Sequence, residues 1–342
     1  MNADPLLTVP LLTVEDLRIR FRMRQGTATA VDGVDFAVRR GEVLGIVGES
    51  GSGKSQILLS IMGLLAGNGT ATGRVRFEGQ DLLALDRRGL DRLRGSAMTM
   101  IFQDPMTSLN PYHRIGAQLT EVLIRHQGMR KREAWDKATR MLDRVKIPDP
   151  AKRMKLYPHE LSGGMRQRVM IAMALLCNPR ILLADEPTTA LDVTVQAQVL
   201  DLLRDLVSEL GTAVILVTHD LGVVAEMCDR VLVLYGGKVM EAAPVGPLFA
   251  APAHPYTRGL LDSTPNLEGA EGELRVIPGQ PRAAAAGDLP GCPFAPRCSR
   301  KVEACTVTMP PLLPAHGQDG RVVACHRPLP QPQPTAAMEL VK

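Results

Sequence analysis

The sequence predicts an α/β protein with a phosphate-binding loop in its core and a small cysteine-containing extension at its end. Three observations support this fold class. A glycine-rich segment at residues 48–55 directly follows a short apolar run, which is the usual context of a nucleotide-binding loop. Further short apolar runs alternate with helical stretches, as buried parallel strands do. After about residue 265 the composition changes: twelve of the 26 prolines and four of the six cysteines lie beyond residue 277.

Size and composition limit the possible functions. The 342 residues suffice for two domains, or for one large domain with an appendage. A net charge of +4 and an aromatic content of 3% argue against nucleic acid as a partner. No apolar run approaches the ~18–20 residues that span a bilayer, and residues 1–10 lack the pattern of a signal peptide. We expect a cytosolic protein that meets a membrane only through its partners.

Hydrophobic periodicity predicts the order of the elements. Residues 12–45 alternate with a period of two, which indicates strands of an antiparallel β subdomain. Polar residues 110–160 indicate helices, which belong to a helical subdomain at about 104–178 inserted into the core. The apolar run 169–177 predicts a buried helix. The buried strands of the α/β core are expected at four short apolar runs: 43–47, 181–184, 213–217 and 231–234.

The phosphate loop is the first candidate site. Its glycines let backbone N–H groups turn inward around phosphates, and a helix that opens at about Lys54 adds a favourable dipole. Lys54 would neutralise the β- and γ-phosphates, and the Ser55 hydroxyl would bind Mg²⁺. The alternative is a glycine-rich turn with a solvated lysine. The expected nucleotide-binding residues are Gly48, Glu49, Ser50, Gly51, Ser52, Gly53, Lys54, Ser55 and Gln56.

Two acids follow the apolar strand at 181–184. Asp185 is expected to bind Mg²⁺, directly or through water. Glu186 is one residue further on, where it could polarise the attacking water. The alternative is a pair of solvated acids at a strand end.

Several weaker signals complete the set. Gln103 could sense Mg²⁺ and the attacking water, and His219 could contact the γ-phosphate. Asp192 could reach across a dimer. Ser162, Gly163 and Gly164 begin a helix suited to touching the γ-phosphate from the side opposite the phosphate loop, which one compact subunit cannot easily do for its own ATP. This pairing predicts a dimer with ATP between the subunits.

Together these motifs resemble the ATP-binding cassette (ABC) transporter ATPases over residues 12–262. They match the family's Walker A loop at 48–55, Q-loop at Gln103, signature at 161–165, Walker B at 181–186, D-loop at 190–192 and switch at His219. The resemblance implies a head-to-tail nucleotide dimer that drives two transmembrane permease subunits. The family also stacks an aromatic ring on adenine, and Phe21 is the candidate here; its other role is that of a core strand residue.

A narrower resemblance concerns the transported solute. Residues 102–111 and 254–257 are similar to the peptide-importer branch, although importers of nickel or other small solutes share them. This branch implies a homologous but different ATPase as partner, and a separate extracytoplasmic solute-binding protein that selects the solute. The chain would then lie at the cytoplasmic face of the bacterial inner membrane.

Four clustered cysteines mark the extension at 263–327. It precedes a Pro- and Gln-rich tail at 328–342, which is expected to be disordered. A cytosolic chain should hold no disulfides, so clustered thiols in a core-poor segment suggest a metal staple. Four thiolates suit either Zn²⁺ or a [4Fe–4S] cluster, and the resemblance to peptide-importer ATPases implies the cluster. His326 is a possible substitute ligand, whereas Cys177 and Cys228 are expected to be buried small hydrophobes. The expected ligands are Cys292, Cys298, Cys305 and Cys325.

Two hypotheses from other functional classes remain open. One is a soluble ABC ATPase without a transport role, which would usually carry tandem cassettes or long coiled-coil insertions. The other is a redox-sensing regulatory subunit built around the cysteines. An intact Glu186 favours an active ATPase.

Overall fold

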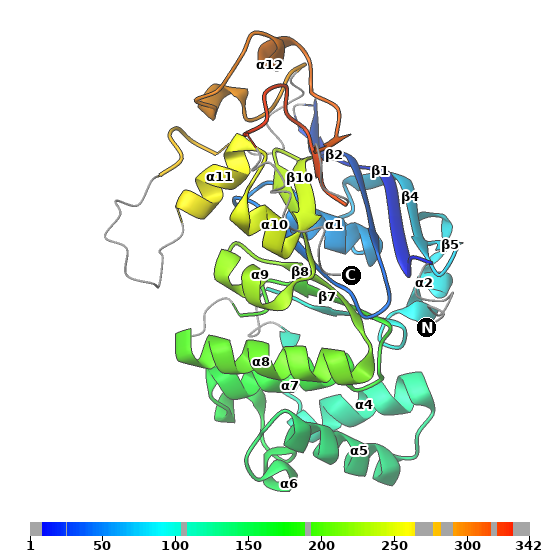
Figure 1. The fold of residues 1–342 in the computed structure, drawn as a ribbon. Helices are drawn as coiled ribbons and strands as arrows, with labels where there is room; N and C mark the ends of the chain where they lie inside the picture. The colour runs from blue at the N-terminus through cyan, green and yellow to red at the C-terminus, as the bar shows by residue number, and fades with distance from the viewer. Residues whose placement is uncertain are drawn as a thin grey trace, which may run out of the picture.

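The fold of the chain was analysed in a computed structural model. The structure describes residues 9–24, 26–103, 108–188, 193–263, 276–281, 290–315 and 320–330. Two sheets meet around a central helix, a group of helices lies at one end of the molecule, and the last segments of the chain lie at the other (Figure 1).

The first sheet is antiparallel, with strand order β2-β1-β4-β5. Along β1, Leu12, Val14, Leu17 and Ile19 are buried, and Leu12 pairs with Val38 of β2. The alternation therefore forms the predicted antiparallel β subdomain, one face of which is buried. The strands are β1 (Leu12–Met23), β2 (Gly26–Val38), β4 (Gly69–Phe77) and β5 (Gln80–Asp81).

The second sheet has eight strands in the order β11-β12-β10-β9-β3-β8-β7-β6. Its centre, from β9 to β6, is parallel, and all four predicted buried strands are confirmed there. Their apolar residues are buried because both faces of the parallel sheet are covered. The strands are β3 (Val43–Val47), β6 (Met98–Ile101), β7 (Ile181–Asp185), β8 (Ala213–Val217), β9 (Arg230–Tyr235), β10 (Lys238–Pro244), β11 (Leu313–Pro314) and β12 (Val322–Val323).

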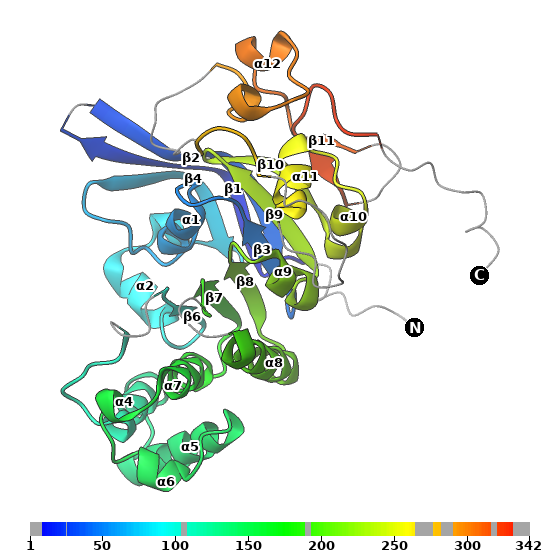
Figure 2. The same ribbon diagram turned by 90° about the vertical axis from the view of Figure 1, so that its left-hand side faces the viewer.

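Helix α1 (Lys54–Ile61) lies between the two sheets (Figure 2). Its residues Ile57, Leu58 and Ile61 are fully buried and share one hydrophobic cluster with both sheets. The helix that carries the end of the phosphate loop is thus held on both sides. The other helices of the core are η2 (Leu82–Ala84), α2 (Arg87–Leu93), α8 (Val193–Leu210), α9 (Leu221–Met227), α10 (Val245–Ala250) and α11 (Pro255–Asp262).

The predicted helical insertion is confirmed, and it forms the end of the molecule below the central sheet in Figure 1. Its helix α5 buries Ala134, Ala138, Met141 and Leu142, a spacing that lies on one helical face. The run at 169–177 lies largely in α7 and is buried as expected. The elements are α4 (Ile115–Gln127), α5 (Lys131–Arg144), α6 (Pro150–Arg153), η3 (Pro158–Glu160) and α7 (Gly163–Leu175).

The last described segments add to the central sheet. Strand β12 pairs antiparallel with β10, and β11 pairs with β12. Phe294 belongs to the larger hydrophobic core and packs against the rings of Tyr235, His254 and Tyr256. The short helices here are η4 (Ala295–Arg297) and α12 (Ala304–Val307). None of the helices in the described segments is long and apolar enough to span a membrane.

Candidate active site: a nucleotide cavity

The phosphate loop connects the end of β3 at Val47 to the start of α1 at Lys54. A Cβ atom at Gly48 would lie 2.1 Å from the carbonyl oxygen of Leu234, and one at Gly53 would lie 2.4 Å from that of Ala30. Both glycines also have positive φ angles, 152° and 102°. Only glycine fits these positions, because any side chain would push the loop off the neighbouring backbone.

The loop lines a cavity of about 470 Å³ together with Gln103, Glu186 and the end of the antiparallel sheet. Lys54 is buried there, and its Nζ donates to the carbonyl oxygens of Gly48 and Glu49 at 2.7 and 3.0 Å. Burial lowers the pKa of Lys54, although nearby carboxylates oppose this shift. A desolvated cation above inward-turned N–H groups fits a bound polyphosphate.

A hydroxyl and a carboxylate meet beside Lys54. Ser55, in the first turn of α1, donates from Oγ to Oδ1 of Asp185 at 2.9 Å. Burial raises the pKa of Asp185, and the Ser55 hydrogen bond and Lys54 oppose that shift. Carboxylate and hydroxyl oxygens are hard donors of the kind that Mg²⁺ takes alongside phosphate oxygens, so these residues fit the ion.

Glu186 lies between two other residues of the predicted site, Gln103 and His219. Its Oε2 accepts from Gln103 Nε2 at 3.0 Å, and its Oε1 lies 3.2 Å from His219 Nδ1. Glu186 adopts a φ angle of 47°, which is unusual for a residue with a side chain, and its N–H donates to Val217. The sharp turn after β7 therefore directs this carboxylate toward the cavity, where it is 15% exposed.

The glycine-rich helix start is separate from this cavity. Ser162 caps α7 by accepting from Met165 N at 3.3 Å, and Gly163 has open space where a Cβ atom would be. Ser162 and Gly163 are exposed, Gly164 is partly exposed, and the described lining of the cavity includes none of the three. Phe21, by contrast, lies at the cavity's edge. Asp192 falls outside the described residues.

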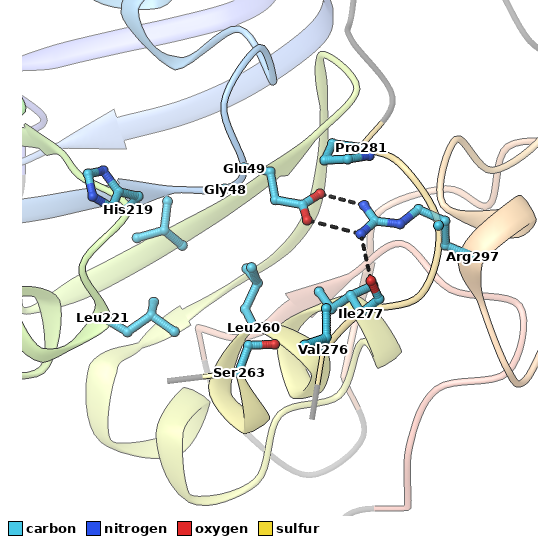
Figure 3. Close-up of a pocket in the computed structure, with 12 residues that line it drawn as sticks. Gly48, Glu49, His219, Leu221, Leu260, Ser263, Val276, Ile277, Pro281 and Arg297 are labelled. Atoms are coloured by element: carbon cyan, nitrogen blue, oxygen red, sulfur yellow. Dashed lines mark hydrogen bonds and ion pairs between the residues drawn. The ribbon is translucent and has the colours of Figure 1, made fainter. Parts of the chain in front are cut away.

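A second cavity, of about 430 Å³, adjoins the start of the phosphate loop and is lined by Gly48, Glu49, His219 and Arg297 among others (Figure 3). In it Arg297 forms two hydrogen bonds to the Glu49 carboxylate, of 2.5 and 3.1 Å. The N–H of Glu49 donates to the hydroxyl of Tyr256 at 2.9 Å. No local pattern in the sequence predicts Arg297 and Tyr256 as neighbours of the loop, because both lie more than 200 residues from Glu49.

The prediction of an iron–sulfur cluster is wrong. Within the described ranges, which include all six cysteines, no group of three or more His, Cys, Asp or Glu side chains is arranged to hold a metal ion. The zinc alternative fails for the same reason. This correction concerns the four proposed ligands, Cys292, Cys298, Cys305 and Cys325.

Packing explains why the thiols do not form a metal site. Cys292 and Cys305 belong to the main hydrophobic core, and the space that the four cysteines and their neighbours line is about 10 Å³, scarcely room for one water. Burial raises the pKa of Cys292 to about 11 and also raises the pKa of Cys298 and Cys325. Burial therefore disfavours the thiolate form of these three cysteines. They pack as small hydrophobes.

Known families match two parts of the chain. The family described as "ABC transporter" matches residues 31–189, and "Oligopeptide/dipeptide transporter, C-terminal region" matches residues 240–305. The second match begins at β10 and includes Phe294 and Arg297.

Similar proteins cover nearly the whole chain. The oligopeptide transport ATP-binding protein OppD of Salmonella typhimurium is 55% identical over 320 residues, 93% of this chain and 94% of that protein. The oligopeptide transport ATP-binding protein AppD of Bacillus subtilis is 50% identical over 318 residues, 92% of this chain and 96% of that protein.

Solved structures agree. A dimeric ATP-binding cassette bound to ADP and Pi in a post-hydrolysis state has a TM-score of 0.62 and 30% identity, covering 68% of this chain and 98% of that chain. The cbiO1 protein of Clostridium perfringens, part of an ABC transporter complex, has a TM-score of 0.61 and 30% identity over 70% of this chain and 91% of its own. The resemblance found in the sequence motifs is confirmed, and the chain belongs to the ABC transporter ATPases, in the branch that carries the oligopeptide/dipeptide transporter C-terminal region.

Proposed function

We propose that this chain is the ATP-hydrolysing subunit of a bacterial ABC importer for di- and oligopeptides. The relatives from Salmonella typhimurium and Bacillus subtilis, 55% and 50% identical, are named for oligopeptide transport, and residues 240–305 match the C-terminal region of that branch. One observation carries the assignment of hydrolysis. Glu186 lies between Gln103 and His219 and lines the same cavity as the phosphate loop, where a carboxylate can polarise water beside a triphosphate.

The residues divide the work of ATP hydrolysis. Backbone N–H groups of the phosphate loop, apart from that of Glu49, surround the phosphates, and Lys54 exchanges its two carbonyl acceptors for the β- and γ-phosphates. Ser55, Asp185 and Gln103 would hold Mg²⁺, which would neutralise phosphate charge when bound. Glu186 takes the proton of the attacking water as general base, and His219 contacts the γ-phosphate. Phe21, at the edge of the same cavity, stacks on adenine.

The second half of each ATP site comes from a partner ATPase. Ser162, Gly163 and Gly164 are outside the cavity of their own loop, and the exposure of the first two leaves them available to a neighbouring subunit. In this arrangement they touch the γ-phosphate bound by the partner, and Asp192 crosses the same interface. The similarity to a solved dimeric cassette supports the dimer, and the branch resemblance favours a homologous, different chain as the partner.

An apolar groove supports a membrane partner. It has a volume of about 580 Å³, lies between the end of β6 and helices α4 and α7, and includes Phe102, Met170 and Met173. Phe102 is 42% exposed and directly precedes Gln103, which contacts Glu186. A segment of a transmembrane permease subunit bound in this groove would contact Phe102, and Gln103 would couple that contact to the position of the Glu186 carboxylate. The chain is then peripheral, at the cytoplasmic face of the inner membrane, and a separate extracytoplasmic protein binds the peptide.

This function implies a division of the chain. Residues 12–262 form the nucleotide-binding domain, with the helical subdomain at about 104–178. Residues 263–327 form the extension of the peptide-importer branch, and 328–342 form a tail.

The test is Glu186→Gln in the chain assembled with its membrane and ATPase partners. ATP should still bind, because the phosphate loop and the Mg²⁺ ligands stay, but turnover at this site should fall by ~10²–10⁴-fold with the loss of the general base. Nucleotide binding and phosphate release are measured on the same preparation. Lys54→Ala is the contrasting variant, expected to lose binding itself. Hydrolysis at the normal rate by Glu186→Gln would rule out the assigned base.

A further inference from the structure

We propose that Arg297, in the C-terminal extension, is a positioning residue for the phosphate loop: it neutralises Glu49 and so keeps the loop receptive to the phosphates of ATP. The inference rests on the proposed function, and it makes the extension part of the nucleotide site. It assigns this task to a residue 248 positions away from the loop.

The ion pair is well built for this task. Arg297 contacts both carboxylate oxygens of Glu49, and its side chain is only 6% exposed. The remaining donors of the guanidinium are also used, because Nε donates to the carbonyl oxygen of Pro278 at 2.9 Å and Nη2 to that of Ile277 at 3.2 Å. Figure 3 shows the bonds to Glu49 and Ile277. Bidentate pairing combined with fixed backbone acceptors holds the Glu49 carboxylate in one position.

The backbone of Glu49 is anchored from the same side. Its N–H donates to the Tyr256 hydroxyl, and the ring of Tyr256 lies against Phe294, three residues before Arg297. Arg297 itself lies over the ring of Tyr235 at 5.8 Å. The side chain and the backbone of Glu49 are therefore both held by residues that pack in one aromatic cluster.

The charge of Glu49 explains why its pairing with Arg297 matters for nucleotide binding. Glu49 follows Gly48 within a loop that binds a polyanion, and an unpaired carboxylate there would repel the phosphates. The Glu49 carboxylate is also close enough to Lys54 to be among the groups that raise the pKa of this lysine, after Glu186 and Asp185. With Arg297 in place, the negative charge of Glu49 is compensated within the second cavity, which both residues line, whereas the described lining of the nucleotide cavity includes neither.

The experiment is a double-mutant cycle on nucleotide affinity. The full chain is prepared as wild type, Arg297→Ala, Glu49→Gln and the double variant, and each is titrated with a fluorescent ATP analogue and Mg²⁺. Arg297→Ala should weaken binding on the order of tenfold, because it leaves an unpaired carboxylate within the loop that binds the phosphates. Glu49→Gln should bind at least as tightly as wild type, and the double variant should recover to within about twofold of it.

Two readouts separate charge from mere structure. The deficit of Arg297→Ala should shrink as KCl is raised, because salt screens the repulsion. Arg297→Lys keeps the charge but loses the bidentate geometry, so it should bind better than Arg297→Ala. The matched control is Arg144→Ala, which removes an arginine from another ion pair, to Glu209 at 2.5 Å, and should leave affinity unchanged.

Each outcome decides the proposal. Normal affinity of Arg297→Ala, or a double variant as weak as the single one, overturns the neutralising role while the ATPase assignment stands. A wild-type chain that binds no ATP would overturn the proposed function and this inference together. Thermal unfolding of each variant shows whether it is folded, and Arg297→Lys carries the test if the alanine variant is not.

Discussion

At the scale of single residues, the glycines of the two nucleotide motifs are required for different reasons. Gly48 is required by the fold, because a Cβ atom there would overlap the backbone of β9 at 2.1 Å. Gly163 has no such neighbour, and it opens α7 directly after the Ser162 cap. Its lack of a side chain is therefore unexplained by this chain alone, and the proposed reason is the approach of a partner's nucleotide.

This contrast predicts the behaviour of Gly163→Ala. The isolated chain should be as stable as wild type or slightly more so, since alanine in a helix is favoured over glycine by roughly 0.5–1 kcal/mol. It should also bind its own ATP normally. In the assembled transporter, hydrolysis at the shared site should fall on the order of 10²-fold, because a methyl group displaces the γ-phosphate contact.

The measurements are thermal unfolding and nucleotide titration of the isolated chain, and phosphate release by the complex. Gly48→Ala serves as the comparison and should lose nucleotide binding in the isolated chain. If hydrolysis by the Gly163→Ala complex is unaffected, this helix start does not approach a nucleotide.

At the scale of elements, helix α11 connects the phosphate loop to the extension. His254 caps it by accepting from Tyr256 N at 3.0 Å, and the N–H of His254 donates to Glu241 at 2.8 Å. The cap uses Nδ1 as an acceptor, so the imidazole must be neutral. His254 is 1% exposed, and burial lowers its pKa to about 3.

The buried cap predicts a loss of stability in acid. Below the ordinary His pKa of 6.5 the unfolded chain binds a proton that the folded chain excludes until about pH 3. The free energy of unfolding should therefore fall as the pH drops through this window, by about 1.4 kcal/mol per pH unit from this histidine. Above pH 7 the contribution is fully present and constant.

The variant His254→Asn isolates this effect, because asparagine also caps helices but does not titrate. Urea unfolding of both proteins from pH 7.5 to 4 gives the difference in free energy at each pH. That difference should change with the expected slope in favour of the variant as the pH falls. Parallel curves would mean that His254 is protonated in the folded state or accessible to solvent there.

At the scale of the whole molecule, the end of the chain is joined to the nucleotide-binding core by a buried ion pair. Arg321 is 1% exposed, and its Nη2 donates to Glu241 of β10 at 2.7 Å. Glu241 also accepts the N–H groups of Ala253 and His254 at the start of α11. One carboxylate thus ties together β10, α11 and the segment that leads into β12.

Removing the arginine should be costly. Arg321→Met leaves Glu241 buried without its cation, and breaking a buried pair in this way typically costs 3–5 kcal/mol. Urea unfolding should show this loss for the entire chain, since the pair spans the core and the extension. The matched control is Arg204→Met, which removes an exposed arginine at 3.3 Å from Glu226 and should cost at most about 1 kcal/mol. Equal costs for the two variants would mean that the Arg321 pair contributes no more than a surface contact.

Most of the fold and the nucleotide cavity could be predicted from the sequence, because their determinants are local. A phosphate loop is contiguous, and a short apolar run bounded by polar residues defines a buried strand. Asp185 ends β7, Glu186 follows it, and His219 follows β8. These strands are parallel neighbours, so the rules of parallel sheets already bring the three residues to one edge. Composition and motif order were also enough to identify the family.

Only the tertiary structure decided the contacts that join distant segments. The pairs between Arg297 and Glu49 and between Arg321 and Glu241 link residues 248 and 80 positions apart, and no periodicity records them. The cysteines show that residues close in the sequence need not form a site together. Their clustering in the sequence predicted a metal site, but spacing does not say how side chains pack. In the structure these four side chains and their neighbours line a space of only about 10 Å³. Local chemistry follows from neighbours in the chain, whereas long-range pairing depends on how the whole chain closes around its core.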